Sequence, residues 1–158
     1  MATQKNDMSS NLSSLEATLE EYLVDKAPFQ LPKNIKELIV SFAPWLIIIF
    51  LVLSLPAVFS IIGFSSMMGP YMMGGMMRYG YHFGPLWWVS MALIVVSVVF
   101  EALAIKGLFA KTMQGWKYVF YAQLISIVAM LFQGNLPGAV LGGLIGLYIL
   151  FQVKEMYT

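Results

Sequence analysis

The feature that most constrains this chain is residues 45–64, WLIIIFLVLSLPAVFSIIGF, which hold no charged side chain over 20 positions. An α-helix rises about 1.5 Å per residue, so a helix of this length covers about 30 Å, the thickness of the hydrocarbon core of a bilayer. Only 11% of the chain is charged, whereas soluble domains usually carry about 25%. The segment therefore predicts a membrane-spanning helix, which Pro56 is expected to kink.

Further apolar segments follow at residues 86–105, 116–133 and 137–153. The last two are separated by residues 134–136, a connection so short that the two helices must be antiparallel neighbours. We therefore expect an all-α, polytopic membrane protein with four transmembrane helices in two antiparallel hairpins. This transmembrane domain covers residues 32–158.

The more polar residues 1–31 predict a separate N-terminal region. Residues 1–13 have the composition of an irregular segment. Ser13 and Glu16 fit a capping box at the start of an amphipathic helix. Its apolar face holds Leu15, Leu19, Tyr22 and Leu23, and its opposite face holds Glu16, Glu20, Glu21 and Asp25. Because acidic side chains are repelled by anionic lipid, we expect this helix to lean on its own domain or a second copy, or to dock on a separate cytoplasmic protein.

Residues 31–44, LPKNIKELIVSFAP, predict a second short helix that leads into the first span along the membrane interface. The distribution of basic residues predicts the orientation. Eight lysines precede the first span, lie between the second and third spans or at the start of the third, or follow the fourth, whereas Arg78 lies on the other side. Because cytoplasmic loops are rich in Lys and Arg, we expect both termini to be cytoplasmic, in a bacterial inner membrane.

The loop at residues 65–83, SSMMGPYMMGGMMRYGYHF, holds six methionines in three adjacent pairs and the one histidine of the chain. Thioether sulfur favours Cu(I) or Ag(I), and the candidate metal ligands are Met68, Met72, Met73, Met76, Met77 and His82. The glycines of this loop make ordering it around an ion entropically costly, and methionine is also an adaptable apolar residue. We favour an apolar turn at the outer interface, with the soft-metal site as the alternative.

Glu101 is an ionisable residue well inside a predicted span, and such residues are candidates for function. It lies five positions before Lys106, close to the expected cytoplasmic edge. We expect it to pair with Lys106 or Lys117 or to extend towards water. A proton or ion relay is the alternative, and it needs further polar groups in sequence.

Gly138, Gly142 and Gly146 form a doubled GxxxG pattern in the last span. Glycines at this spacing allow two helix backbones to approach closely. The pattern predicts tight packing of this helix, against the third span or against a second copy.

Composition and motifs exclude several classes of protein. The absence of cysteine excludes disulfides and thiolate metal sites, and a net charge of +1 argues against a nucleic-acid partner. His82 and Glu101 are about 28 Å apart if the intervening residues are helical, so they cannot share a proton. We find no catalytic triad, phosphate loop or carboxylate pair, and we predict no enzyme activity and no cofactor.

Three stretches, FEALAIKGLF, KTMQGWKYVFYAQLIS and GNLPGAVLGGLIGLYILFQVKEMY, resemble a group of small four-span membrane proteins of small-genome bacteria. The resemblance covers residues 34–158. It implies a bacterial inner-membrane protein of this layout and implies no activity.

We therefore predict a non-enzymatic membrane protein that acts as a scaffold or accessory subunit of a membrane assembly. Its partners would be the lipid bilayer and either further copies of the chain or another membrane or cytoplasmic protein. The alternative is a soft-metal binding or small transport protein that uses the methionine loop. An oligomeric pore would need a polar stripe, which these spans lack.

Overall fold

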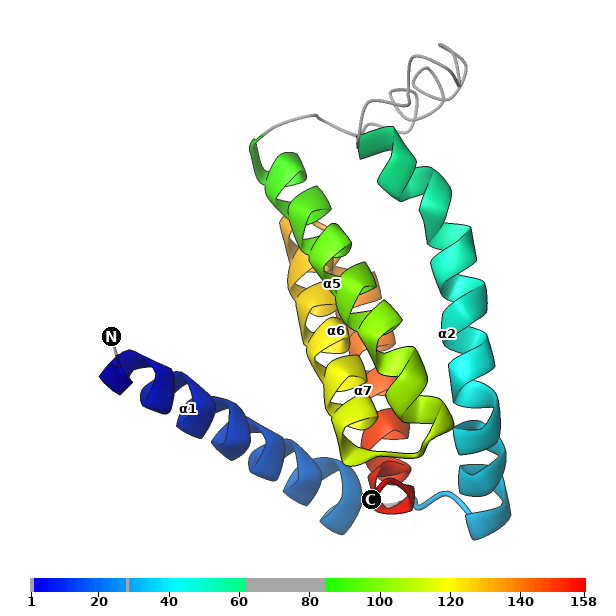
Figure 1. Ribbon diagram of the computed structural model, residues 1–158. Helices are drawn as coiled ribbons and strands as arrows, with labels where there is room; N and C mark the ends of the chain where they lie inside the picture. The colour runs from blue at the N-terminus through cyan, green and yellow to red at the C-terminus, as the bar shows by residue number, and fades with distance from the viewer. Residues whose placement is uncertain (1, 28, 62–84) are drawn as a thin grey trace.

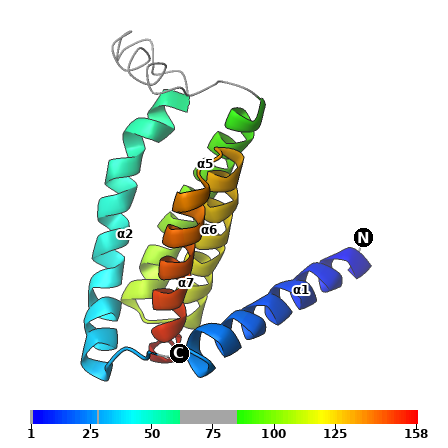
Figure 2. The same cartoon turned by 180° about the vertical axis from the view of Figure 1, so that it is seen from behind.

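The computed structural model describes residues 2–27, 29–61 and 85–158, which form helices and no strand. The elements in chain order are α1 (Ala2–Glu20), the π-helical turn η1 (Glu21–Asp25), α2 (Lys33–Ile61), α5 (Pro85–Phe109), α6 (Met113–Phe132), the π-helical turn η2 (Gly138–Gly142), α7 (Gly143–Gln152) and the 3₁₀ turn η3 (Lys154–Met156). Helices α2, α5, α6 and α7 form a bundle, and α1 extends away from it (Figure 1, Figure 2).

Within these described residues, three helices are long and apolar enough to cross a membrane, over Lys33–Pro56, Trp88–Phe109 and Met113–Phe132. Only 11% of the most apolar window of α2 is buried in the protein. Exposed apolar surface on this scale is stable when lipid covers it. The three helices are thus compatible with a multi-pass membrane protein. The fourth expected span, residues 137–153, is represented by a shorter apolar helix, Gly138–Gln152.

The first span begins earlier than expected. Residues 31–44 do not form a separate lead-in helix, because α2 continues without interruption from Lys33 through Pro44 and Pro56 to Ile61. Val40 and Pro44 lie one turn apart and are both buried against the bundle. Packing of this shared face stabilises the continuous helix, although Pro44 removes a backbone hydrogen bond.

The N-terminal helix also begins earlier than expected. The expected irregular segment, residues 1–13, was predicted wrongly, since α1 is helical from Ala2. Ser13 is not its N-cap, because the Ser13 hydroxyl donates to the carbonyl of Ser10 at 3.0 Å, inside the helix. Extending a helix that has already formed is much easier than starting one, so a polar segment can continue it.

Among the described helices, α5 and α6 form the most extensive contact. Two glycines allow their backbones to approach closely. A Cβ placed on Gly107 would lie 2.5 Å from Cα of Gly115, and one placed on Gly115 would lie 2.4 Å from the carbonyl carbon of Gly107. The two backbones are therefore in direct contact, which any side chain at either position would prevent. The connection is equally tight: Lys111 has φ +52°, and Thr112 caps α6 by accepting from the N–H of Gly115.

The buried core lies near one end of the bundle, where α5 ends and α6 begins. Trp116 and Phe120 of α6 stack with ring centroids 5.5 Å apart, and Phe151 of α7 meets Trp116 edge-on at 5.3 Å. All three rings are at most 2% exposed. The start of α2 and the C-terminus both lie at this end of the bundle (Figure 1).

We predict that Gly115→Ala destabilises the protein, because its Cβ would collide with the backbone of α5. Overpacking of this kind costs about 1–3 kcal/mol. Gly142→Ala is the matched control, since a Cβ there meets nothing within 4 Å and alanine favours helix over glycine by roughly 1 kcal/mol. Thermal unfolding in detergent measures both. Equal effects of the two substitutions would contradict the close approach of α5 and α6.

Candidate functional site

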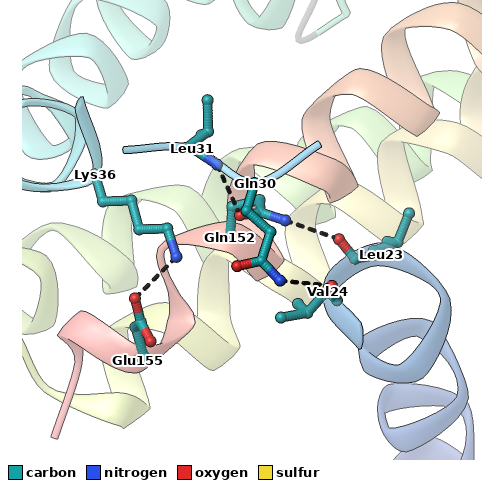
Figure 3. Close-up of polar contacts among 7 residues, drawn as sticks. All are labelled: Leu23, Val24, Gln30, Leu31, Lys36, Gln152 and Glu155. Atoms are coloured by element: carbon teal, nitrogen blue, oxygen red, sulfur yellow. Dashed lines mark hydrogen bonds and ion pairs between the residues drawn. The ribbon is translucent and has the colours of Figure 1, made fainter. Parts of the chain in front are cut away.

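Most of the described polar interactions between distant segments gather at the end of the bundle where the C-terminus and the start of α2 lie (Figure 1). We call this set the terminal cluster, and it consists of Glu16, Glu20, Lys36, Gln152, Lys154 and Glu155. Its members come from α1, from the start of α2 and from the C-terminal end of α7 and η3. Figure 3 shows how the part around Gln152 and Lys36 joins these segments.

Gln152 is the buried centre of the terminal cluster, with only 1% of its surface exposed. Its Nε2 donates to the carbonyl of Leu23 at 3.0 Å, and its Oε1 accepts from the N–H of Leu31 at 3.2 Å (Figure 3). A buried amide group without partners costs about 1–3 kcal/mol. Both polar atoms of the side-chain amide are thus partnered, and they connect α7 to η1 and to the linker that joins η1 to α2.

Lys154 holds the C-terminal half of α1 in place. Its Nζ lies 2.9 Å from Glu16 Oε1 and 2.6 Å from Glu20 Oε2. The Lys154 side chain is only 16% exposed, and its Nζ also lies 5.1 Å above the Trp116 ring. Glu16 and Glu20 therefore face the C-terminal end of α7, although they were expected on the solvated face of an amphipathic helix.

Burial on its own lowers the pKa of Lys154, but the hydrogen bonds to Glu20 and Glu16 outweigh it and raise the pKa above its ordinary value. The ammonium thus stays charged throughout the physiological range. Because the folded pKa is raised, the contribution of Lys154 to stability is complete below about pH 10.5 and is lost as the pH rises through the folded pKa.

A second ion pair joins the start of α2 to the last residues of the chain. Lys36 Nζ lies 2.9 Å from Glu155 Oε1, and the Lys36 side chain is 10% exposed. Between the two ion-paired lysines lies a cavity of about 250 Å³. Its lining includes Glu20, Gln152 and Tyr157 in addition to these lysines. The cavity is small, and its charged groups are already paired with one another.

Tyr157 closes the apolar side of this region and is 4% exposed. Burial raises the pKa of its hydroxyl to about 12. The backbone beside it is also fixed, because the Thr158 N–H donates to the carbonyl of Lys111 and the Thr158 carbonyl accepts from the N–H of Met113, both at 3.0 Å. The C-terminus is thereby attached to the α5–α6 connection.

The expected metal ligands Met68, Met72, Met73, Met76, Met77 and His82 lie outside the described residues. Within residues 2–27, 29–61 and 85–158, no group of three His, Cys, Asp or Glu side chains could hold a metal ion. The soft-metal hypothesis therefore stays a prediction.

Glu101 lies on α5, at a cavity bounded by α2, α5 and α6. The ion pairs of the described residues involve Lys26, Lys36 and Lys154. The expected pairing of Glu101 with Lys106 or Lys117 is not among them. Glu101 instead lines this cavity together with Ser54 of α2, Ser97 of α5 and Ser126 of α6.

The glycines of the doubled GxxxG pattern have different surroundings. A Cβ on Gly146 would lie 2.5 Å from Nε2 of Gln123, so Gly146 lies against α6. Gly142 has nothing within 4 Å of its Cβ position. Gly138 lies beside Asn135, whose Oδ1 accepts from the Gly138 N–H at 3.0 Å. Only part of the predicted glycine face therefore lies in the described helix contact.

The buried stripe of this helix is shifted by one position from the glycine pattern. Ala139, Gly143 and Leu147 are buried, and a Cβ on Gly143 would lie 3.0 Å from the Ile127 side chain of α6. The buried residues keep the spacing of four within the π-helical turn η2 and after it, so the buried stripe lies beside the glycine pattern over the whole helix. Gly143 therefore lies against α6, whereas Gly142 has nothing within 4 Å of its Cβ position.

Sequence reasoning missed Gln152, Lys154 and Glu155 as members of a site. A polar or charged triplet directly after an apolar helix is usually solvated, so position alone does not distinguish them. The QVKE stretch, in which a glutamine still lies inside the apolar run, was the one available indication. A buried glutamine needs hydrogen-bond partners, and these come from segments far away in the sequence.

Comparisons with family models, curated proteins and solved structures found no match for this chain. The resemblance of residues 34–158 to small four-span proteins of small-genome bacteria stays a prediction. The function is therefore inferred from the chemistry of the residues and the geometry of the structure.

We predict that Lys154→Met loosens α1. Methionine keeps the apolar contacts with Trp116 and Phe151 but leaves Glu16 and Glu20 facing each other without a cation. Hydrogen bonds to charged groups contribute about 1.5–3 kcal/mol, so amide exchange in α1 and η1 should become about tenfold faster or more. Hydrogen–deuterium exchange in detergent measures this. Lys117→Met is the control, because Lys117 is exposed near the same end of the bundle as Lys154. Equal exchange rates in the two variants would contradict the role of the Lys154 ion pairs in holding α1.

We also predict a loss of stability at high pH that depends on Tyr157. The unfolded tyrosine ionises near pH 10 and the folded one near pH 12, so between these values the unfolded state has lost a proton that the folded state keeps. Stability then falls as the pH rises, by about 1–3 kcal/mol. Melting temperatures from pH 8 to 11.5 should fall less in Tyr157→Phe than in the wild type. Tyr22→Phe, at an exposed position, should follow the wild type, and parallel curves for all three would refute the assignment.

Proposed function

We propose that this chain is a multi-pass protein of a bacterial inner membrane, with four spans in two hairpins and both termini in the cytoplasm. The three long apolar helices support this arrangement. The shorter helix Gly138–Gln152 runs beside α6 (Figure 2) and supplies the fourth span when its apolar flanking residues are included. The lysines at the ends of α5 and α7 and at the starts of α2 and α6 lie at one end of the bundle, which the positive-inside rule assigns to the cytoplasm.

Its function in this proposal is that of a non-enzymatic scaffold or accessory subunit of a membrane assembly. The observation that carries this is the position of α1: its C-terminal half is clamped by Lys154, while the rest of the helix extends away from the bundle (Figure 1). A helix held in one direction by partly buried ion pairs loses little entropy when a partner binds it. It is therefore a preorganised docking element.

The exposed surface of α1 fits a protein partner better than lipid. Ser10, Asn11, Ser14 and Ala17 are exposed, and Leu15 adds an apolar contact with 42% of its surface exposed. A polar surface with a single apolar centre is typical of a reversible protein interface. The partner in this proposal is a further copy of the chain or another membrane or cytoplasmic protein, and nucleic acid is not proposed.

The test is site-specific photo-crosslinking in intact membranes. A photoreactive residue at the exposed Ala17 should form discrete adducts, whose mass distinguishes a second copy from another protein. Lys154→Met should weaken these adducts, because it releases α1 from its fixed direction. The same photoreactive residue at the exposed Lys117 serves as the control. Identical adduct patterns at Ala17 and Lys117, unaffected by Lys154→Met, would refute a role of α1 in docking.

A further inference from the structure

The cavity beside Glu101 is separate from the terminal cluster and from the proposed docking role of α1. Its volume is about 390 Å³, and it lies between α2, α5 and α6. It extends from Glu101 towards Asn135 in the α6–α7 connection, so it reaches the end of the bundle opposite the C-terminus. Cavities of roughly 300–1,000 Å³ are the usual size of small-molecule sites.

Two of the three serines that line the cavity already donate their hydroxyl protons to backbone carbonyls. Ser54 of α2 donates its proton to the carbonyl of Leu51, and Ser97 of α5 donates to the carbonyl of Ile94, both at 2.8 Å. A serine has one proton to donate and two lone pairs to accept with. These two residues therefore act as acceptors for a ligand, and Ser126 of α6 adds a third hydroxyl to the lining.

Glu101 gives this acceptor-rich lining its charge. It belongs to none of the ion pairs of the described residues. A carboxylate inside a low-dielectric region attracts a cation strongly, because little water screens it. The hydroxyls of Ser54 and Ser97 in the same cavity keep lone pairs that can accept hydrogen bonds, so the preferred partner is a cationic group that donates N–H hydrogen bonds.

Gln133 and Asn135 add two amide groups to the lining, and Asn135 Oδ1 already accepts from the N–H of Gly138. The remaining lining is apolar and includes Phe50, Ile94, Val98 and Met130. A bare hard cation requires six or more oxygens around one point, whereas these polar groups are distributed over three helices and the α6–α7 connection. An apolar body with a single ammonium group satisfies both parts of the lining.

We propose that this cavity binds a lipophilic organic amine in its protonated form. The ammonium group lies against Glu101 and donates to Ser97 and Ser126. The apolar body lies along Phe50 and Met130. The cavity thus gives the protein a small-molecule site in its membrane-embedded part, in addition to the proposed docking of α1.

The test is calorimetric titration of the detergent-purified full-length protein with phenylbutylamine. Phenylbutanol, which has a similar shape and no charge, is the ligand control. Glu101→Gln keeps the shape of the side chain and removes its charge, and Glu37→Gln removes an exposed carboxylate on α2 outside the cavity. Ser126→Leu narrows the cavity and leaves Glu101 intact, so it tests the site independently if Glu101→Gln folds poorly.

We expect saturable binding of the amine by the wild type and by Glu37→Gln. Binding should be at least about tenfold weaker in Glu101→Gln and in Ser126→Leu, since loss of a charge-assisted hydrogen bond costs about 1.4 kcal/mol or more. The alcohol should bind weakly to all four proteins. Equal binding of amine and alcohol, undiminished binding by both cavity variants, or no saturable binding by the wild type would each overturn the proposal.

Discussion

The buried amide of Gln152 is the contact on which the arrangement of the chain ends depends. With 1% of its surface exposed, the side chain is stable only while both of its amide atoms are hydrogen-bonded. Its partners are the backbone carbonyl of Leu23 in η1 and the backbone N–H of Leu31 in the linker between η1 and α2. Gln152 thereby fixes this linker on the end of α7. Lys154 lies two residues after Gln152 and forms ion pairs with Glu16 and Glu20 of α1. These ion pairs set the direction in which α1 leaves the bundle.

The two ends of the bundle differ in how their interiors are filled. At the end where the C-terminus lies, aromatic rings and paired charges fill the interior. The Trp116 indole there donates to the carbonyl of Leu150 at 2.8 Å. Towards the other end, the helices separate enough to leave a cavity with a carboxylate and hydroxyls. A rigid end suits the presentation of α1 to a partner, and an open end suits a ligand. The proposed scaffold role and the proposed amine site therefore use different parts of one fold.

Sequence reasoning predicted the long apolar helices, and the structure confirms an all-helical chain with three helices long enough to span a membrane. It was wrong about residues 1–13 and about a separate lead-in helix, because helix continuation across Ser13 and Pro44 depends on neighbouring turns and on packing. The close approach of Gly107 and Gly115 was also missed. Two glycines in different helices carry no pattern of their own, and only the path of the α5–α6 connection brings them together.

The sequence by itself determined the helical class and the apolar character of the bundle, because the length of an uncharged segment is a local property. The tertiary structure alone decided which polar residues meet. Lys154 and Glu20 are 134 positions apart, and no periodicity links them. The packing of the last helix likewise decided that Gly143 rather than Gly142 lies against α6. Such contacts depend on how the helices pack, which the order of residues within each helix does not reveal.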